Sequence, residues 1–116
     1  MDKIRIDNLV FSGKHGAYKK ARNVEQEFEV YVEISFDATL SARTDKLEDT
    51  VDYSGMKNSV REIIEGSSCY LIEKLASNIA DKILLDKRIA GVSVMVKKTS
   101  VWDNGAPSVT VNKSRR

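Results

Sequence analysis

Lys98 is a lysine whose position in the sequence could support proton transfer. It continues the alternation of Val92, Val94 and Val96, so a regular strand would point its amine toward the same face as these valines. Partial burial disfavours the charged form of a lysine, and such a lysine can exchange protons near neutral pH. The alternative is a strand-end lysine that only extends its amine into water.

Two further polar side chains stand at the starts of predicted helices. Glu73 lies in the first turn of one helix, where a carboxylate either complements the helix dipole or holds an N–H-rich ligand through paired hydrogen bonds. Tyr53 begins the other helix, on the same side as its apolar residues. Its phenol is either a proton relay or the polar end of a core tyrosine.

The segment from Lys14 to Arg22 is basic. It contains Lys14, Lys19, Lys20 and Arg22, with no acidic residue before Glu25. Such a run is either a solvated loop or a docking site for phosphate or another anion.

The remaining candidates are single residues without an obvious partner. His15 lies in a glycine-flanked loop, and Trp102 lies in the last turn, where it is either a lid or a loop anchor. His15 and Cys69 are the only histidine and cysteine, so the chain predicts neither an internal disulfide nor a His/Cys zinc cluster of its own.

The elements that must position these residues follow from hydrophobic periodicity. Alternating apolar residues predict strands, and apolar residues spaced three or four apart predict helices. Gly66 and the serines after it are expected to end the first helix and cap the second. The predicted elements are strands at 3–11 and 26–40, a polar loop to about residue 52, helices at about 53–65 and 70–85, and strands around 92–96 and 109–111.

This order, β-β-α-α-β-β, predicts an α+β architecture with both helices on one face of an antiparallel sheet. Its long edge strands favour oligomerisation.

The length of 116 residues predicts one domain over residues 1–116. A net charge of +2 does not indicate a nucleic-acid partner, and we expect neither a membrane span nor a secretory leader. We therefore expect a cytoplasmic protein.

Four segments in this order resemble the dihydroneopterin aldolase family over nearly the whole chain. They are Gly13-Lys14-His15-Gly16, the run from Thr44 to Tyr53, the run from Leu71 to Ala76, and the run from Val94 to Lys98.

The resemblance implies the tunnelling fold, in which four subunits pool their antiparallel sheets into one barrel with the helices outside. It implies a homo-oligomer, a tetramer or an octamer, with active sites between subunits. It also implies a folate-biosynthesis lyase that cleaves the pterin substrate 7,8-dihydroneopterin into 6-hydroxymethyl-7,8-dihydropterin and glycolaldehyde. Epimerisation at C2′ can share the same retro-aldol intermediate. The substrate's own C=N bond serves as the electron sink, so the resemblance implies no cofactor, no metal and no lysine Schiff base.

The resemblance also implies site residues. Glu73 matches the glutamate that anchors the pterin amino group and ring N–H, and the Ile72 backbone matches the adjoining contact. Val51 lies in the segment that lines the pterin. Lys98 matches the catalytic lysine near N5, and Tyr53 matches a tyrosine that moves protons across a subunit boundary.

The chain departs from the family pattern in the basic segment. Ala21 stands where the family usually has a glutamate, and Thr99 stands where it often has a proline. Two alternatives therefore remain: an epimerase or aldolase acting on phosphorylated dihydroneopterin, and a non-catalytic pterin-binding paralogue.

Overall fold

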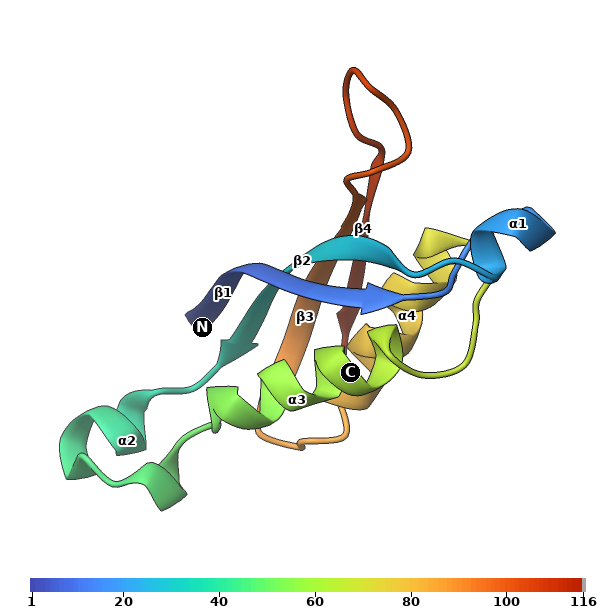
Figure 1. Ribbon diagram of the computed structural model, residues 1–116. Helices are drawn as coiled ribbons and strands as arrows, with labels where there is room; N and C mark the ends of the chain where they lie inside the picture. Colours follow the sequence, from blue (N-terminus) through green and yellow to red (C-terminus); the bar gives the residue numbers. More distant parts are fainter. Residues whose placement is uncertain (116) are drawn as a thin grey trace.

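A four-stranded antiparallel sheet and two long helices form the computed structural model, which describes residues 1–115 (Figure 1). The strands lie in the order β1-β2-β3-β4, so each strand pairs with its neighbour in the sequence. The elements are β1 Asp2–Gly13, α1 Lys19–Arg22, β2 Gln26–Phe36, α2 Thr39–Thr44, η1 Leu47–Asp49, α3 Tyr53–Ile64, α4 Ile72–Ile83, β3 Ile89–Lys98 and β4 Ser108–Ser114. The predicted element order and the antiparallel α+β architecture are confirmed.

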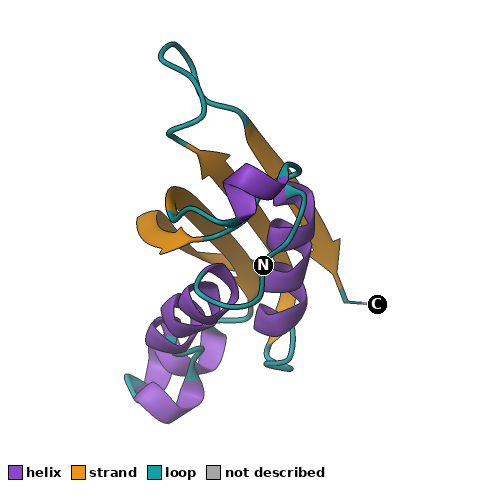
Figure 2. Ribbon diagram, turned by 45° about the vertical axis from the view of Figure 1, so that its right-hand side comes forward, coloured by secondary structure: helices purple, strands orange, loops and turns teal. Residues whose placement is uncertain are grey.

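The core lies between the sheet and the two long helices, which Figure 2 shows on the same side of the strands. Every second residue of β2 from Phe28 to Phe36 is buried, as the alternation predicts. The three valines of β3 at 92, 94 and 96 are buried beside them. The helices complete the core with Met56, Val60 and Ile64 of α3 and Leu75, Ala76, Ile79, Ala80 and Ile83 of α4.

The segment after β2 differs from the prediction. The strand ends at Phe36 rather than at residue 40, and the expected loop contains α2 and η1. Asp37 accepts a hydrogen bond from the Thr39 N–H at 2.9 Å, which turns the chain out of the sheet. Hydrogen bonding to the Thr39 side chain, and then to its backbone N–H, lowers the pKa of the Asp37 carboxyl. Thr44 Oγ1 then donates to Asp49 at 2.6 Å and closes the segment. Hydrogen bonds made by side chains, rather than an apolar stripe, therefore shape it.

Two other local predictions need correction. Ser67 and Ser68 do not cap α4, because the helix begins at Ile72 after Leu71 and has no side-chain cap. Tyr53 does not join the core, because its side chain is 63% exposed at the start of α3.

The second face of the sheet and both edge strands carry no further element within residues 1–115. Residues on this face include Glu29, Tyr31 and Glu33 of β2, and Tyr31 Oη donates to the Asn8 side chain at 2.6 Å. None of the described helices is long and apolar enough to span a membrane. The open edges of β1 and β4 fit the expected association of subunits.

Candidate active site

Lys98 is the last residue of β3, and its backbone pairs with the buried Phe28 of β2. Its half-buried side chain lies on the helix-covered side, as the alternation with the valines predicts. The side chain reaches Gly16, where an added Cβ would lie 3.3 Å from Lys98 Nζ and would collide with the Ala21 Cβ. Glycine at position 16 therefore lets the loop backbone approach the lysine amine.

A cavity of about 720 Å³ opens beside Lys98. The segment that contains α1 forms one wall, and the start of the β3–β4 connection forms another. Its polar lining includes Lys20, Gln26, Lys98 and Ser100, and Ala21 and Val101 also contribute. This volume falls in the range of small-molecule sites, about 300–1,000 Å³.

His15 holds the loop beside this cavity and is itself buried, with 1% of its surface exposed. Its Nδ1 accepts a hydrogen bond from the Cys69 N–H at 2.9 Å, so Nε2 carries the proton and donates to the Ile64 carbonyl at 2.6 Å. Its ring packs edge-on against Phe28, with centroids 5.3 Å apart. His15 therefore joins the loop to the end of α3 and to the segment before α4.

Two polar side chains fix the rest of the loop. Gln26 Nε2 donates to the Ala21 carbonyl at 3.2 Å. Arg22 Nη1 donates to the carbonyls of Gly16 and Ala17 at 3.1 and 3.0 Å, and its guanidinium lies 4.1 Å from the centroid of the Tyr70 ring. Arg22 is thus engaged within the loop. If the basic segment docks an anion, its lysines rather than Arg22 would do so. Periodicity gave no indication of these roles, because they depend on loop carbonyls.

Glu73 and Ile72 begin α4 at the same end of the sheet as Lys98. The Gly16 N–H donates to the Cys69 carbonyl at 3.0 Å, which ties the residues before α4 to the loop at Lys98. Ile72 packs against the core, whereas the Glu73 carboxylate is exposed and has no hydrogen bond to any described residue. Glu73 is therefore available to accept hydrogen bonds from a ligand.

Val51 and Tyr53 lie at the opposite end of the sheet. Arg88, just before β3, donates a hydrogen bond from Nη1 to the Thr50 carbonyl and so holds this segment at the start of the strand. A ten-residue strand such as β3 spans about 30 Å. A single subunit therefore does not bring Tyr53 to Lys98.

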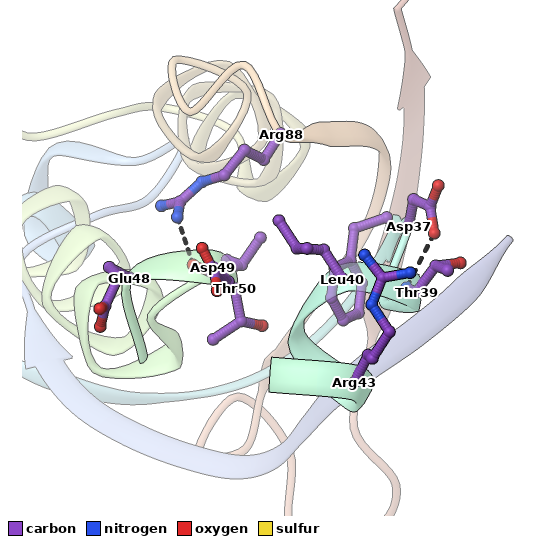
Figure 3. Close-up of a pocket in the computed structure, with 10 residues that line it drawn as sticks. Asp37, Thr39, Leu40, Arg43, Glu48, Asp49, Thr50 and Arg88 are labelled. Carbon is purple, nitrogen blue, oxygen red and sulfur yellow. Dashed lines mark hydrogen bonds between the residues drawn. The ribbon is translucent and has the colours of Figure 1, made fainter. Parts of the chain in front are cut away.

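A second cavity, of about 440 Å³, lies at the end of the sheet where Val51 is found (Figure 3). The Val51 side chain is 2% exposed and belongs to the core, so only its backbone and a small part of its surface face this cavity. Arg43, Asp49 and Arg88 contribute charged groups around it (Figure 3). The sequence analysis did not identify Arg88. Asp86, two residues before it, is a recognisable turn signal that could have pointed to it. The Asp86 carboxylate accepts hydrogen bonds from the Arg88 backbone N–H and guanidinium at 2.9–3.1 Å.

The sequence model of the dihydroneopterin aldolase family matches residues 4–113. The chain belongs to the dihydroneopterin aldolase family. A dihydroneopterin aldolase of Streptococcus pyogenes serotype M6 is 37% identical over 99 residues, which cover 84% of this chain and 83% of the relative. One from Staphylococcus haemolyticus is 40% identical over 82 residues, which cover 71% of this chain and 98% of the relative.

The fold of the family is also evident in solved structures. The Escherichia coli dihydroneopterin aldolase, solved in complex with neopterin, superposes with a TM-score of 0.92 at 23% identity, covering 98% of this chain and all of that one. This match confirms the predicted α+β fold of the single chain, an antiparallel sheet with two helices on one face. Among the described residues, no group of three or more His, Cys, Asp and Glu side chains is placed to hold a metal ion.

Proposed function

We propose that the chain is a dihydroneopterin aldolase, a carbon–carbon lyase that acts in the cytoplasm on 7,8-dihydroneopterin. Membership of the family carries this proposal. The family match from residue 4 to residue 113 supports one domain over residues 1–116. The placement of Lys98 beside a cavity, at the same end as the available carboxylate of Glu73, fits a small-molecule site there.

The proposed reaction is a retro-aldol cleavage. A base removes the proton of the C2′ hydroxyl, the C1′–C2′ bond breaks, and glycolaldehyde leaves with the new carbonyl. The bonding electron pair moves into the C6=N5 bond of the dihydropterin, and protonation at C1′ then gives 6-hydroxymethyl-7,8-dihydropterin. Re-addition of the aldehyde from the other face would give the C2′ epimer.

Each candidate side chain has a role in this scheme. Glu73 accepts hydrogen bonds from the pterin amino group and ring N–H, next to the Ile72 backbone. Lys98 moves protons near N5, and Tyr53 of a neighbouring subunit exchanges a proton with the side chain of the substrate. The Val51 backbone of that neighbour lines the pterin.

Because the substrate carries its own electron sink, we propose that neither a metal nor a Schiff base takes part. Borohydride added during turnover should then leave Lys98 without a covalent adduct, as measured by mass spectrometry, and chelators should leave the rate unchanged. A Lys98 adduct that forms only with substrate would contradict this part of the proposal.

The central test is a product assay by chromatography on purified protein given 7,8-dihydroneopterin. The Lys98→Ala variant should lose about 100-fold or more in kcat. Lys97→Ala is the matched control, because Lys97 lies over the Tyr31 ring on the other face of the sheet, 5.8 Å from its centroid. Equal activity of the two variants would refute the role of Lys98. Pterin binding without turnover by the wild type would favour the non-catalytic paralogue.

The distance between the two ends of the sheet supports a site shared between subunits of a tetramer or octamer. Lys98→Ala and Tyr53→Phe chains, unfolded and refolded together in equal amounts, should regain about a quarter of the wild-type sites, because each site then draws its lysine and tyrosine from different chains at random. No recovery in mixed oligomers would place both residues in one subunit. Native mass spectrometry gives the subunit number.

A further inference from the structure

His15 is a buried polar side chain that the proposed reaction does not use. Within residues 1–115 it is the only polar or charged side chain in the core, with 1% of its surface exposed. Its Nδ1 accepts from the Cys69 N–H and its Nε2 donates to the Ile64 carbonyl, so both ring nitrogens are engaged. Neither nitrogen is left for a substrate. A contribution of His15 to the reaction must therefore pass through the elements that it holds.

The glycine before this histidine is explained by the packing of the ring. A Cβ added at Gly13 would lie 2.7 Å from His15 Nε2 and still closer to the Ile64 carbonyl oxygen, the two atoms that this hydrogen bond joins. Only glycine lets the backbone of β1 come this close to the bonded pair. The segment from Gly13 to Gly16 is therefore built to hold the imidazole in one orientation.

The Cys69 peptide group is held by the His15 loop on both of its sides. Its N–H donates to His15 Nδ1 at 2.9 Å, and its carbonyl accepts from the Gly16 N–H at 3.0 Å. The Gly16 backbone in turn lies against the amine of Lys98, since an added Cβ there would be 3.3 Å from Lys98 Nζ. The His15 ring also packs on Phe28, which pairs with Lys98 across the strands. The Cys69 peptide is thus fixed relative to Lys98.

The same peptide leads directly into the helix that carries Glu73. Helix α4 begins at Ile72, three positions after Cys69, and no side chain caps its start. The position of its first turn therefore depends on the segment before it, which His15 holds. Cys69, Glu73 and Lys98 belong to one chain, and His15 is buried inside it. The link is therefore the same whichever neighbouring subunit completes the site.

We propose that His15 is a positioning residue, whose hydrogen bond to the Cys69 N–H fixes the distance between Lys98 and Glu73. The inference rests on the proposed function, in which Glu73 anchors the pterin and Lys98 moves protons near N5. A pterin held by Glu73 presents its reacting carbons to Lys98 only while the two elements keep their relative position. A displacement of about 1 Å at a reacting centre costs up to about 100-fold in rate. Loss of the bond therefore lowers kcat and leaves the affinity set by Glu73 nearly unchanged.

The experiment removes this hydrogen bond from either side. His15→Gln keeps a donor for the Ile64 carbonyl but has no acceptor at the position of Nδ1. Cys69→Pro removes the N–H that donates and leaves His15 in place. Each of these bond-removing variants should lower kcat for 7,8-dihydroneopterin by about 10–100-fold. The Kd for neopterin, measured by fluorescence titration, should change by less than about threefold.

Two matched variants keep the hydrogen bond. His15→Asn retains an acceptor near the position of Nδ1, and Cys69→Ala retains the backbone N–H while losing the thiol. Both bond-keeping variants should hold kcat within about threefold of the wild type. His15→Asn and His15→Gln each keep one of the two buried hydrogen bonds, so a loss of stability alone would affect them alike. Rates are expressed per neopterin-binding site, so that unfolded protein does not lower them, and circular dichroism checks the fold.

Equal kcat per site in the bond-removing and bond-keeping variants would overturn the inference and leave the proposed function intact. So would a loss of neopterin affinity as large as the loss of kcat, because the binding site itself would then have been lost. Where one bond-removing variant does not fold, the other decides. Failure of both to fold would make the bond purely structural and overturn the inference. A wild type that does not cleave 7,8-dihydroneopterin would overturn the proposed function and this inference together.

Discussion

Replacing His15 by alanine should destabilise the protein more than any surface change in the same loop. The side chain makes two buried hydrogen bonds, at 2.9 Å from the Cys69 N–H and at 2.6 Å to the Ile64 carbonyl, and its ring packs on Phe28. Leaving both backbone groups unsatisfied and losing the ring contact costs about 3–6 kcal/mol. This is a large part of the total stability of a typical domain, about 5–15 kcal/mol.

The geometry also predicts which replacements are better tolerated. Asparagine places an oxygen near the position of Nδ1 and can accept the Cys69 bond, whereas glutamine places an amide N–H near Nε2 and can donate to Ile64. Each should restore about half of the stability that alanine loses. Both should therefore fall between the wild type and His15→Ala.

Urea unfolding followed by circular dichroism measures these differences. With an m-value of about 2 kcal/mol/M, His15→Ala should lower the midpoint by about 1.5–3 M. The protein concentration must be held fixed, because an oligomer gains stability with concentration. Lys14→Ala, an exposed neighbour, is the control and should change the midpoint little. A midpoint for His15→Ala within about 0.5 M of the wild type would refute the role assigned to the two hydrogen bonds.

Three further predictions concern the two ends of the sheet. Glu73→Ala should weaken pterin binding at least tenfold without changing the oligomer, because the carboxylate is exposed and bonds to no described residue; unchanged affinity by fluorescence titration would rule out the anchor role. Tyr53→Phe should lower kcat about 100-fold and leave the native mass unchanged, and a kcat close to that of the wild type would exclude the hydroxyl from proton transfer. Hydrogen bonds from Arg88 lower the pKa of the Asp86 carboxyl, so this pair stabilises the fold above the unfolded pKa of about 3.9, and the stabilisation is lost as the pH falls through the lower folded-state pKa. Asp86→Asn should therefore be less stable than the wild type by up to about 1 kcal/mol at pH 7, and the difference should disappear in urea unfolding once the pH falls below the folded-state pKa; a pH-independent difference would contradict this cause.

Elements with a strong hydrophobic period were predictable from the sequence. The alternation from Phe28 to Phe36 gave β2 and its buried face, and continuing the alternation of β3 placed Lys98 on the helix-covered side. These predictions succeed because burial of one face requires a fixed period, and the period is visible without knowledge of the fold.

The local errors have a different origin. The α2 segment has no apolar stripe, and its shape depends on hydrogen bonds such as the one from Thr39 to Asp37. Ser67 and Ser68 looked like caps, yet the residues after them are held by His15, which lies more than fifty positions earlier in the chain. Periodicity cannot show a contact between distant loops, and tertiary contacts override a local capping preference.

Some features of the candidate site were likewise predictable from the sequence, and others were not. The types and positions of Lys98, Glu73 and Tyr53 were recognisable in the sequence, but not that Tyr53 lies at the other end of a strand of about 30 Å from Lys98. Because of that separation, the open edges of the sheet have a second role in the proposed shared site. The edges of β1 and β4 favour a neighbour because their backbone groups are unpaired. The same neighbour can bring the Tyr53 end of one sheet to the Lys98 end of the next. Pairing of edge strands would then stabilise the assembly and complete the site at once, so a chain that folds but remains monomeric should bind pterin poorly and cleave none.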